Sequence, residues 1–92
     1  MSTSHAHVPT DAAPRYVKQL VAHLGRKVPV TDGEHLAFEF GTGVVRAAPD
    51  GVLLEATAAD EEALARVEDV LGRHLERFGQ RNELVVSWTR SG

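Results

Sequence analysis

Hydrophobic residues recur at helical spacing in two segments, residues 14–24 and 61–78. In the first segment and the residue before it, the apolar positions are Ala13, Tyr16, Val17, Leu20 and Leu24. In the second they are Leu64, Val67, Val70, Leu71, Leu75 and Phe78. A spacing of three and four residues predicts amphipathic helices. Pro14 suits a first helical turn, Asp60 can cap the second helix, and a glycine follows each segment.

Alternating polar and apolar residues predict strands at both ends of the chain and between the helices. Residues 4–8 and 84–88 are the terminal strands, and residues 36–40, 44–48 and 52–57 are clear middle strands. We expect turns at Gly41-Thr42-Gly43 and at Pro49-Asp50-Gly51. Residues 27–31 are ambiguous, because Pro29 lacks the backbone donor that a central strand needs.

The order strand, helix, three or four strands, helix, strand predicts an α+β fold. It is a two-layer sandwich, a mainly antiparallel sheet of five to six strands with two helices on one face. The 92 residues are expected to form a single domain, 1–92. Asp32-Gly33 is a hairpin signal and favours four middle strands. Because successive elements of a two-layer domain usually alternate in direction, four strands make the two helices run in opposite directions.

Composition excludes several classes of function. The formal net charge is −3, which gives no electrostatic attraction to nucleic acid or to an anionic membrane. With no cysteine, the chain has neither disulfides nor thiolate sites. No apolar run approaches the roughly 20 residues that span a bilayer. The polar N-terminus has no signal-peptide core, so a cytoplasmic location is the expectation.

Each predicted helix carries a histidine in its last turn, His23 and His74. A histidine there can be a ligand, a proton carrier or a pH-sensitive charge, and the alternative is a ring bonded to a carbonyl at its helix end. With three middle strands both rings lie at one end of the domain. With four, we expect opposite ends, with His23 near the Gly41-Thr42-Gly43 turn. The expected neighbours of His74 are then Asp32, His35, Asp50 and Glu83.

Other candidate sites carry weaker signals. His5 and His7 share one strand face and can present two imidazoles to a metal, but a closed site needs more ligands. The serines lie in no nucleophile elbow, and nothing selects Glu39 or Glu55 as a base. The residues by themselves therefore name no catalytic group, metal or cofactor.

The chain resembles the bacterial domain-of-unknown-function 2218 family over roughly residues 4–88. The N-terminal half carries Ala6-His7-Val8-Pro9-Thr10, Arg15-Tyr16, Lys18-Gln19-Leu20, His23 and Lys27-Val28. The C-terminal half carries Glu55-Ala56, Asp60, Leu64, His74-Leu75-Glu76-Arg77-Phe78, Arg81 and residues 84–88. The resemblance implies a small bacterial protein without an assigned activity, with an accessory role in iron or siderophore use. The family commonly has a second histidine where this chain has Arg26, which argues against a two-histidine metal site on the first helix.

Three hypotheses follow. The first is a non-catalytic binding or accessory protein, in iron or siderophore metabolism as the resemblance implies, whose small-molecule or metal ligand contacts the helix ends. The ligand-binding residues would be His23, Arg26, His74, Arg77 and Arg81. The second is a small enzyme that uses His23 or His74 as an acid–base group. The third is a homodimeric interaction module whose open sheet face is lined by Ala37, Glu39, Val44 or Val45, and Glu55.

Overall fold

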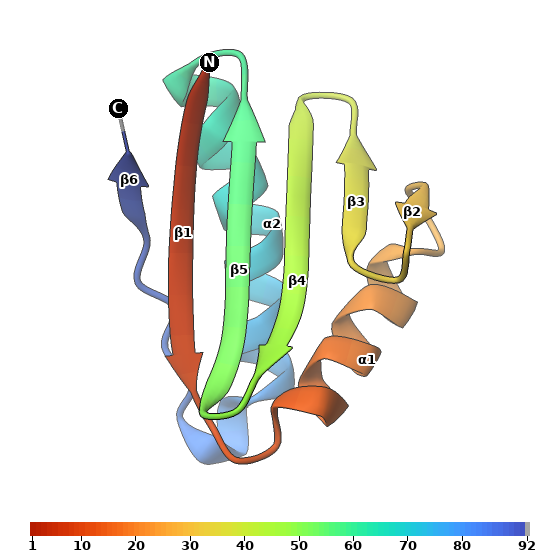
Figure 1. The fold of residues 1–92 in the computed structure, drawn as a ribbon, viewed down its shortest axis with the longest axis vertical. Coiled ribbons are helices and arrows are strands. Elements are labelled where there is room, and N and C mark those ends of the chain that lie inside the picture. Colours follow the sequence, from red (N-terminus) through yellow and green to blue (C-terminus); the bar gives the residue numbers. More distant parts are fainter. Residues whose placement is uncertain (92) are drawn as a thin grey trace.

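The computed structural model describes residues 1–91 and has two helices on one face of a six-stranded antiparallel sheet (Figure 1). The elements in chain order are β1 (Ser2–Pro9), α1 (Ala13–Leu24), β2 (Val30–Thr31), β3 (His35–Phe38), β4 (Gly41–Ala48), β5 (Gly51–Ala58), α2 (Glu61–Phe78), the 3-10 turn η1 (Gln80–Asn82) and β6 (Thr89–Ser91). The spatial order of the strands is β2-β3-β4-β5-β1-β6. The predicted α+β two-layer fold is confirmed.

Four strands separate the helices, as Asp32-Gly33 indicated. Asp32 and Gly33 both have positive φ, 57° and 71°, which is the backbone that a tight hairpin between β2 and β3 requires. Pro29 leaves β2 only two residues long, at the outer edge of the sheet. The two helices run in opposite directions: α1 rises from the end of β1, and α2 descends from the end of β5 (Figure 1).

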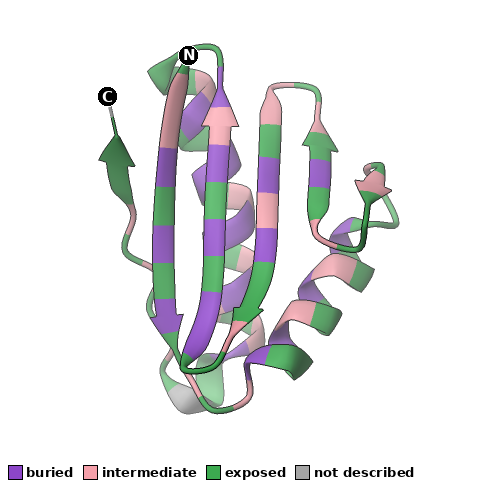
Figure 2. Ribbon diagram, viewed as in Figure 1, coloured by how far each residue is buried: buried purple, intermediate pink, exposed green. Residues whose placement is uncertain are grey.

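The core lies between the sheet and the helices. Figure 2 shows buried and exposed residues alternating along β1 and β5, so one sheet face carries the core and the other faces solvent. On β4, Val45 is fully buried, whereas Val44 is half-buried on the open face. Of the two alternatives predicted for the open face, Val44 rather than Val45 therefore lies there, and Glu39 lies in the turn between β3 and β4.

Two strand boundaries differ from the sequence prediction. The predicted turn Gly41-Thr42-Gly43 is the start of β4, and the turn falls at Glu39 and Phe40. Gly43 is a packing residue, because a Cβ there would lie 2.9 Å from Leu71 Cδ1 on α2. The predicted last strand, residues 84–88, is not part of the sheet, which β6 joins only at Thr89–Ser91.

Residues 84–88 nevertheless alternate in burial, and we call residues 84–91 the C-terminal segment. Its inward side chains pack on α2 rather than on the sheet: Trp88 and Val86 lie over Gly72, and Leu84 lies over Gly79. Among residues 1–91 no helix is both long and apolar enough to cross a membrane.

Candidate functional site: a histidine cleft between the helices

The rings of His23 and His74 lie in contact, with centroids 5.1 Å apart and an interplanar angle of 44°. His23 is exposed in the last turn of α1, and His74 is half-buried on α2. Phe78, one turn after His74, meets His23 edge-on at 5.5 Å and 81°. The expectation that the two histidines occupy opposite ends of the domain is therefore wrong.

The helix directions were predicted correctly, so the error lies in treating a last helical turn as an end of the domain. Helix α1 has 12 residues and is inclined toward the β2 edge of the sheet (Figure 1). Helix α2 has 18 residues and continues for a full turn beyond His74. The last turn of α1 therefore meets the second half of α2.

Hydrogen bonding fixes the orientation and the tautomer of His74. Its Nδ1 lies 2.6 Å from the carbonyl oxygen of Val70, one turn earlier in α2. Since a carbonyl only accepts, Nδ1 carries the proton and donates it. In the neutral ring Nε2 then has the free lone pair and can accept from a ligand.

Positive charges surround His23 and favour its neutral form. Its pKa lies below the ordinary value, first because packing removes part of its hydration, and then because His74 in its protonated form and the charges of Arg26, Lys27 and Arg77 repel an added proton. The structure thus places four of the five predicted ligand-binding residues, His23, Arg26, His74 and Arg77, in one neighbourhood.

Arg81, the fifth predicted residue, lies in η1 beyond the end of α2. It neither lines the cleft nor acts on the pKa of His23. Asp32, His35, Asp50 and Glu83, the expected neighbours of His74, do not line the cleft either.

Beside the two rings is a cavity of about 250 Å³, which we call the histidine cleft. Its lining residues are His23, Leu24, Lys27, Val28, Phe38, Val70 and His74. The walls are mostly apolar, and no carboxylate is among them. Sequence reasoning missed Phe38, because a strand residue gives no signal of which helix end it will face. It also missed Lys27, although that residue is four after His23.

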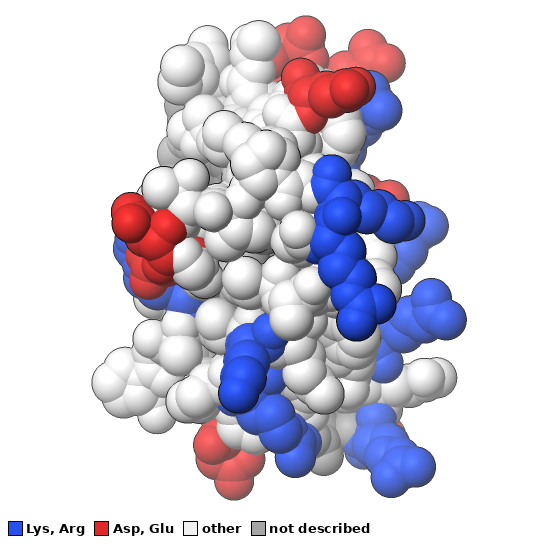
Figure 3. All heavy atoms as spheres, turned by 90° about the vertical axis from the view of Figure 1, so that its right-hand side faces the viewer, with Lys and Arg blue, Asp and Glu red and all other residues white. Residues whose placement is uncertain are grey.

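The cations around the cleft are not neutralised by carboxylates in the part of the chain that the structure describes. Within residues 1–91, Arg26, Lys27 and Arg77 form no ion pair with a carboxylate. Figure 3 shows the side of the molecule on which α1 lies. Lys and Arg side chains spread over this face, and carboxylates lie near its edges. This surface is therefore locally basic, although the net charge of the chain is −3.

The described residues offer no all-protein metal site. Residues 1–91 hold no group of three or more histidine and carboxylate side chains placed to bind one ion. The two cleft imidazoles could at most complete the coordination of a metal that arrives with its own ligands. On the open sheet face, His7 Nε2 instead pairs with Asp50 Oδ1 at 3.1 Å.

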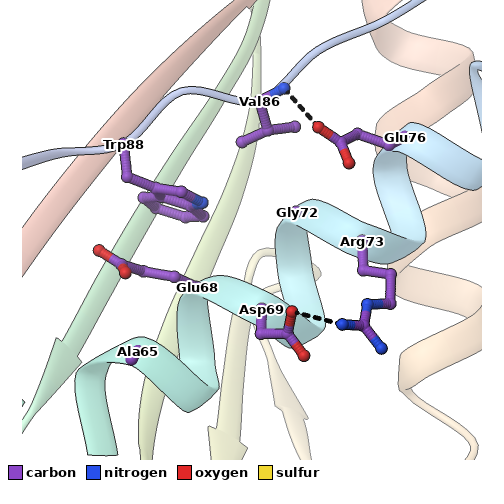
Figure 4. Close-up of a pocket in the computed structure, with 8 residues that line it drawn as sticks. All are labelled: Ala65, Glu68, Asp69, Gly72, Arg73, Glu76, Val86 and Trp88. Carbon is purple, nitrogen blue, oxygen red and sulfur yellow. Dashed lines mark hydrogen bonds and ion pairs between the residues drawn. The ribbon is translucent and has the colours of Figure 1, made fainter. Parts of the chain in front are cut away.

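A second hollow, the C-terminal groove, lies between α2 and the C-terminal segment and has a volume of about 380 Å³ (Figure 4). It is lined by Ala65, Glu68, Asp69, Gly72, Arg73, Glu76, Val86 and Trp88. Glu76 Oε2 accepts from the Val86 amide at 2.9 Å, and Asp69 pairs with Arg73 at 3.1 Å.

Glu68 is the most buried carboxylate of the groove, with its side chain 11% exposed, and it accepts two hydrogen bonds from Arg90 at 3.0 and 3.3 Å. Burial by itself would raise the pKa of Glu68, but the Arg90 hydrogen bonds and charge lower it below the ordinary value. The groove carboxylates thus all have partners within the protein.

Comparison with known proteins gives a family and a fold but no activity. Residues 5–89 match a family described as uncharacterized protein conserved in bacteria, domain of unknown function 2218. The chain is 34% identical to PA4090 from Pseudomonas aeruginosa, known from an NMR structure, with a TM-score of 0.79 over 97% of this chain and 96% of that one. No curated protein matches. The chain therefore belongs to the bacterial domain-of-unknown-function 2218 family.

Proposed function

We propose that this protein is a small non-catalytic binding protein that holds an anionic, oxygen-rich ligand at the histidine cleft. The observation that carries the proposal is the set of cations, Arg26, Lys27 and Arg77, around a cleft that contains no carboxylate. Cations without partners in the fold are free to bind an anion, and Arg in particular can hold carboxylate or catecholate oxygens with two parallel hydrogen bonds.

The two imidazoles add polar contacts of the right kind. His74 is oriented by its bond to Val70, so its Nε2 is available to accept from a ligand hydroxyl. The surroundings of His23 favour its neutral form, which can donate or accept according to its tautomer. A site with fixed acceptors and surrounding cations suits a ligand that carries both hydroxyl and anionic oxygens.

Ferric siderophores are the specific ligand class that we propose, and the support is the iron-related role that the family resemblance implies. A cleft of about 250 Å³ is smaller than the roughly 300–1,000 Å³ of sites that engulf a drug-sized molecule. It can therefore hold one arm of a siderophore, while Arg26 and Arg77 contact the charged remainder outside.

Isothermal calorimetry with a ferric tricatecholate, a ferric hydroxamate and Fe(III)-citrate tests the proposal, with Fe(II), Fe(III) and Zn(II) salts as further probes. We expect heat with the anionic tricatecholate, and weaker heat after His74→Ala or Lys27→Met. His7→Ala is the matched control, since His7 lies on the open sheet face. The absence of heat and of thermal shift with every probe would overturn the proposal.

An acid–base enzyme is the second candidate, favoured by one observation. A concave site adjoins both rings, and the lowered pKa of His23 favours the neutral ring, which is the form that can act as a base. An activity screen with ester, lactone and phosphoester substrates tests this candidate, with His23→Gln as the inactive comparison. Equal rates for the wild type and His23→Gln on every substrate would remove it.

A further inference from the structure

We propose that the histidine cleft takes a small planar aromatic anion, with its ring against Phe38 and His74 and its anionic group at the mouth beside Lys27. The inference rests on the proposed function, because it assigns the chemical class of the group that enters the same cleft. It follows from the shape, the rings and the charges of the lining residues.

The volume and the apolar walls of the histidine cleft fit a ligand group that consists of a single flat ring. Leu24, Val28 and Val70 give the cleft apolar sides, and its volume of about 250 Å³ lies below the usual range for drug-sized ligands. Apolar walls favour a ligand that loses hydration easily, and a flat ring fills such a space without the entropy cost of ordering a flexible chain.

The aromatic wall is held in place before any ligand arrives. Phe38 stacks on Phe40 with centroids 5.4 Å apart and an interplanar angle of 14°. The guanidinium of Arg66 lies 4.4 Å from the centre of the Phe40 ring. Stacking among Phe38, Phe40 and Arg66 fixes the face that Phe38 presents, and a fixed face binds a ring at lower entropic cost.

The histidine side of the cleft is held in a similar way. The Nδ1–H bond to Val70 orients His74, and the ring of His23 contacts both His74 and Phe78. A ligand ring therefore meets oriented aromatic groups contributed by α2 and β3. Phe38 and His74 lie far apart in the sequence, and the fold alone brings them together.

Charge selects an anion over a neutral ring. Lys27 lines the cleft, and Arg26 and Arg77 lie close enough to lower the pKa of His23. No carboxylate lines the cavity, so a neutral or cationic ring would leave these charges without a partner. A carboxylate or phenolate on the ring supplies that partner.

Amide chemical-shift titration of the full chain tests the inference with three probes. Benzoate has the ring and the charge, cyclohexanecarboxylate has the charge with a saturated ring, and benzyl alcohol has the ring without the charge. We expect benzoate to bind in the millimolar range, with shifts at Leu24, Lys27, Phe38 and Val70. The other two should bind about two- to tenfold more weakly.

Two variants with matched controls assign the contacts. Phe38→Leu should remove the preference for benzoate over cyclohexanecarboxylate, whereas Leu53→Ala on the open sheet face should leave it unchanged. Lys27→Met should weaken benzoate about fivefold, whereas Lys18→Met on the same side of the molecule should not. Unchanged spectra outside the substituted neighbourhood show that each variant is folded.

Equal affinity for benzoate and cyclohexanecarboxylate, or benzoate shifts that map to the C-terminal groove, would overturn the inference. If a ferric hydroxamate binds and no aromatic acid does, the aromatic inference fails and the proposed function stands. If benzoate binds in the cleft and no ferric siderophore does, the aromatic inference stands and the siderophore proposal fails.

Discussion

The histidine cleft and the C-terminal groove both adjoin α2, yet they use their charged residues in opposite ways. In the groove, Glu68 binds Arg90, Glu76 binds the Val86 amide and Asp69 binds Arg73. Around the cleft, Arg26, Lys27 and Arg77 have no carboxylate partner within residues 1–91. The groove is the larger hollow, about 380 against about 250 Å³, but its polar groups already stabilise the fold.

The difference teaches that the size of a hollow is a poor guide to function. A polar group that is hydrogen-bonded within the protein has less charge and fewer free hydrogen-bonding sites left for a ligand, and breaking its internal bond costs about 1–3 kcal/mol where the group is buried. A cation without a partner has no such bond to lose. We therefore assign the groove to stability and the cleft to binding, and four predictions test this assignment.

The largest expected effect is in the groove. Trp88→Ala removes the aromatic ring that lies over Gly72, and because Trp88 is half-buried, we expect a loss of about 2 kcal/mol in the free energy of unfolding. Urea denaturation measures it. Val85→Ala, in the same segment but 68% exposed, should cost about 0.5 kcal/mol or less. If the folded Trp88→Ala variant no longer bound benzoate, the assignment of the groove to stability and the cleft to binding would be wrong.

The next effect comes from the ion pair between Glu68 and Arg90. Glu68→Ala leaves Arg90 without its bidentate partner, so we expect a loss of about 1.5 kcal/mol in the free energy of unfolding. Asp69→Ala is the control, because the exposed pair of Asp69 with Arg73 should contribute about 0.5 kcal/mol or less. Equal losses in the free energy of unfolding for the two variants would show that the burial of Glu68 does not strengthen its ion pair.

Substitutions around the histidine cleft should have the opposite effect from those in the C-terminal groove: they should weaken ligand binding and leave the free energy of unfolding nearly unchanged. The double variant Arg26→Gln/Arg77→Gln should change the free energy of unfolding by about 0.5 kcal/mol or less, since neither arginine has an ion-pair partner among the described residues. Calorimetry should show about a tenfold weaker affinity for a ferric tricatecholate. A large loss of stability with unchanged affinity would place these arginines in the fold rather than in the site.

The smallest expected effect is on the pH dependence of stability. Because the pKa of His23 is lower in the folded protein than its ordinary value of 6.5, the unfolded state binds more protons at acidic pH. The contribution of His23 is therefore favourable above pH 6.5 and is lost as the pH falls from 6.5 through the folded pKa. Urea denaturation between pH 8 and 5 should show the wild type losing more stability than His23→Gln. Parallel curves for the two proteins would contradict the assigned shift.

Local patterns predicted most of the elements. Helix α2 begins and ends where its apolar stripe, Asp60 and Gly79 indicated, and Asp60 Oδ1 does accept from the Ala63 amide. Helix α1 starts one residue earlier than predicted, at Ala13. These predictions succeed because capping and helical periodicity depend on residues within a few positions of one another.

Residues 84–88 show where such patterns stop being informative. Their alternation correctly indicates which side chains are buried, but it does not show what buries them. Leu84, Val86 and Trp88 pack on α2, and the backbone joins the sheet only after Trp88. A period of two describes an extended chain with one buried side, whether that side faces a sheet or a helix.

The sequence by itself determined the two-layer α+β fold and the family, and it favoured the four strands between the helices that make the helices run in opposite directions. Only the tertiary structure decided that His23 and His74 touch and that Phe38 and Lys27 complete their cleft. The physical reason is that a contact between two helices depends on their relative lengths and inclination. Those quantities are set by packing against the whole sheet, and no local pattern of residues encodes them.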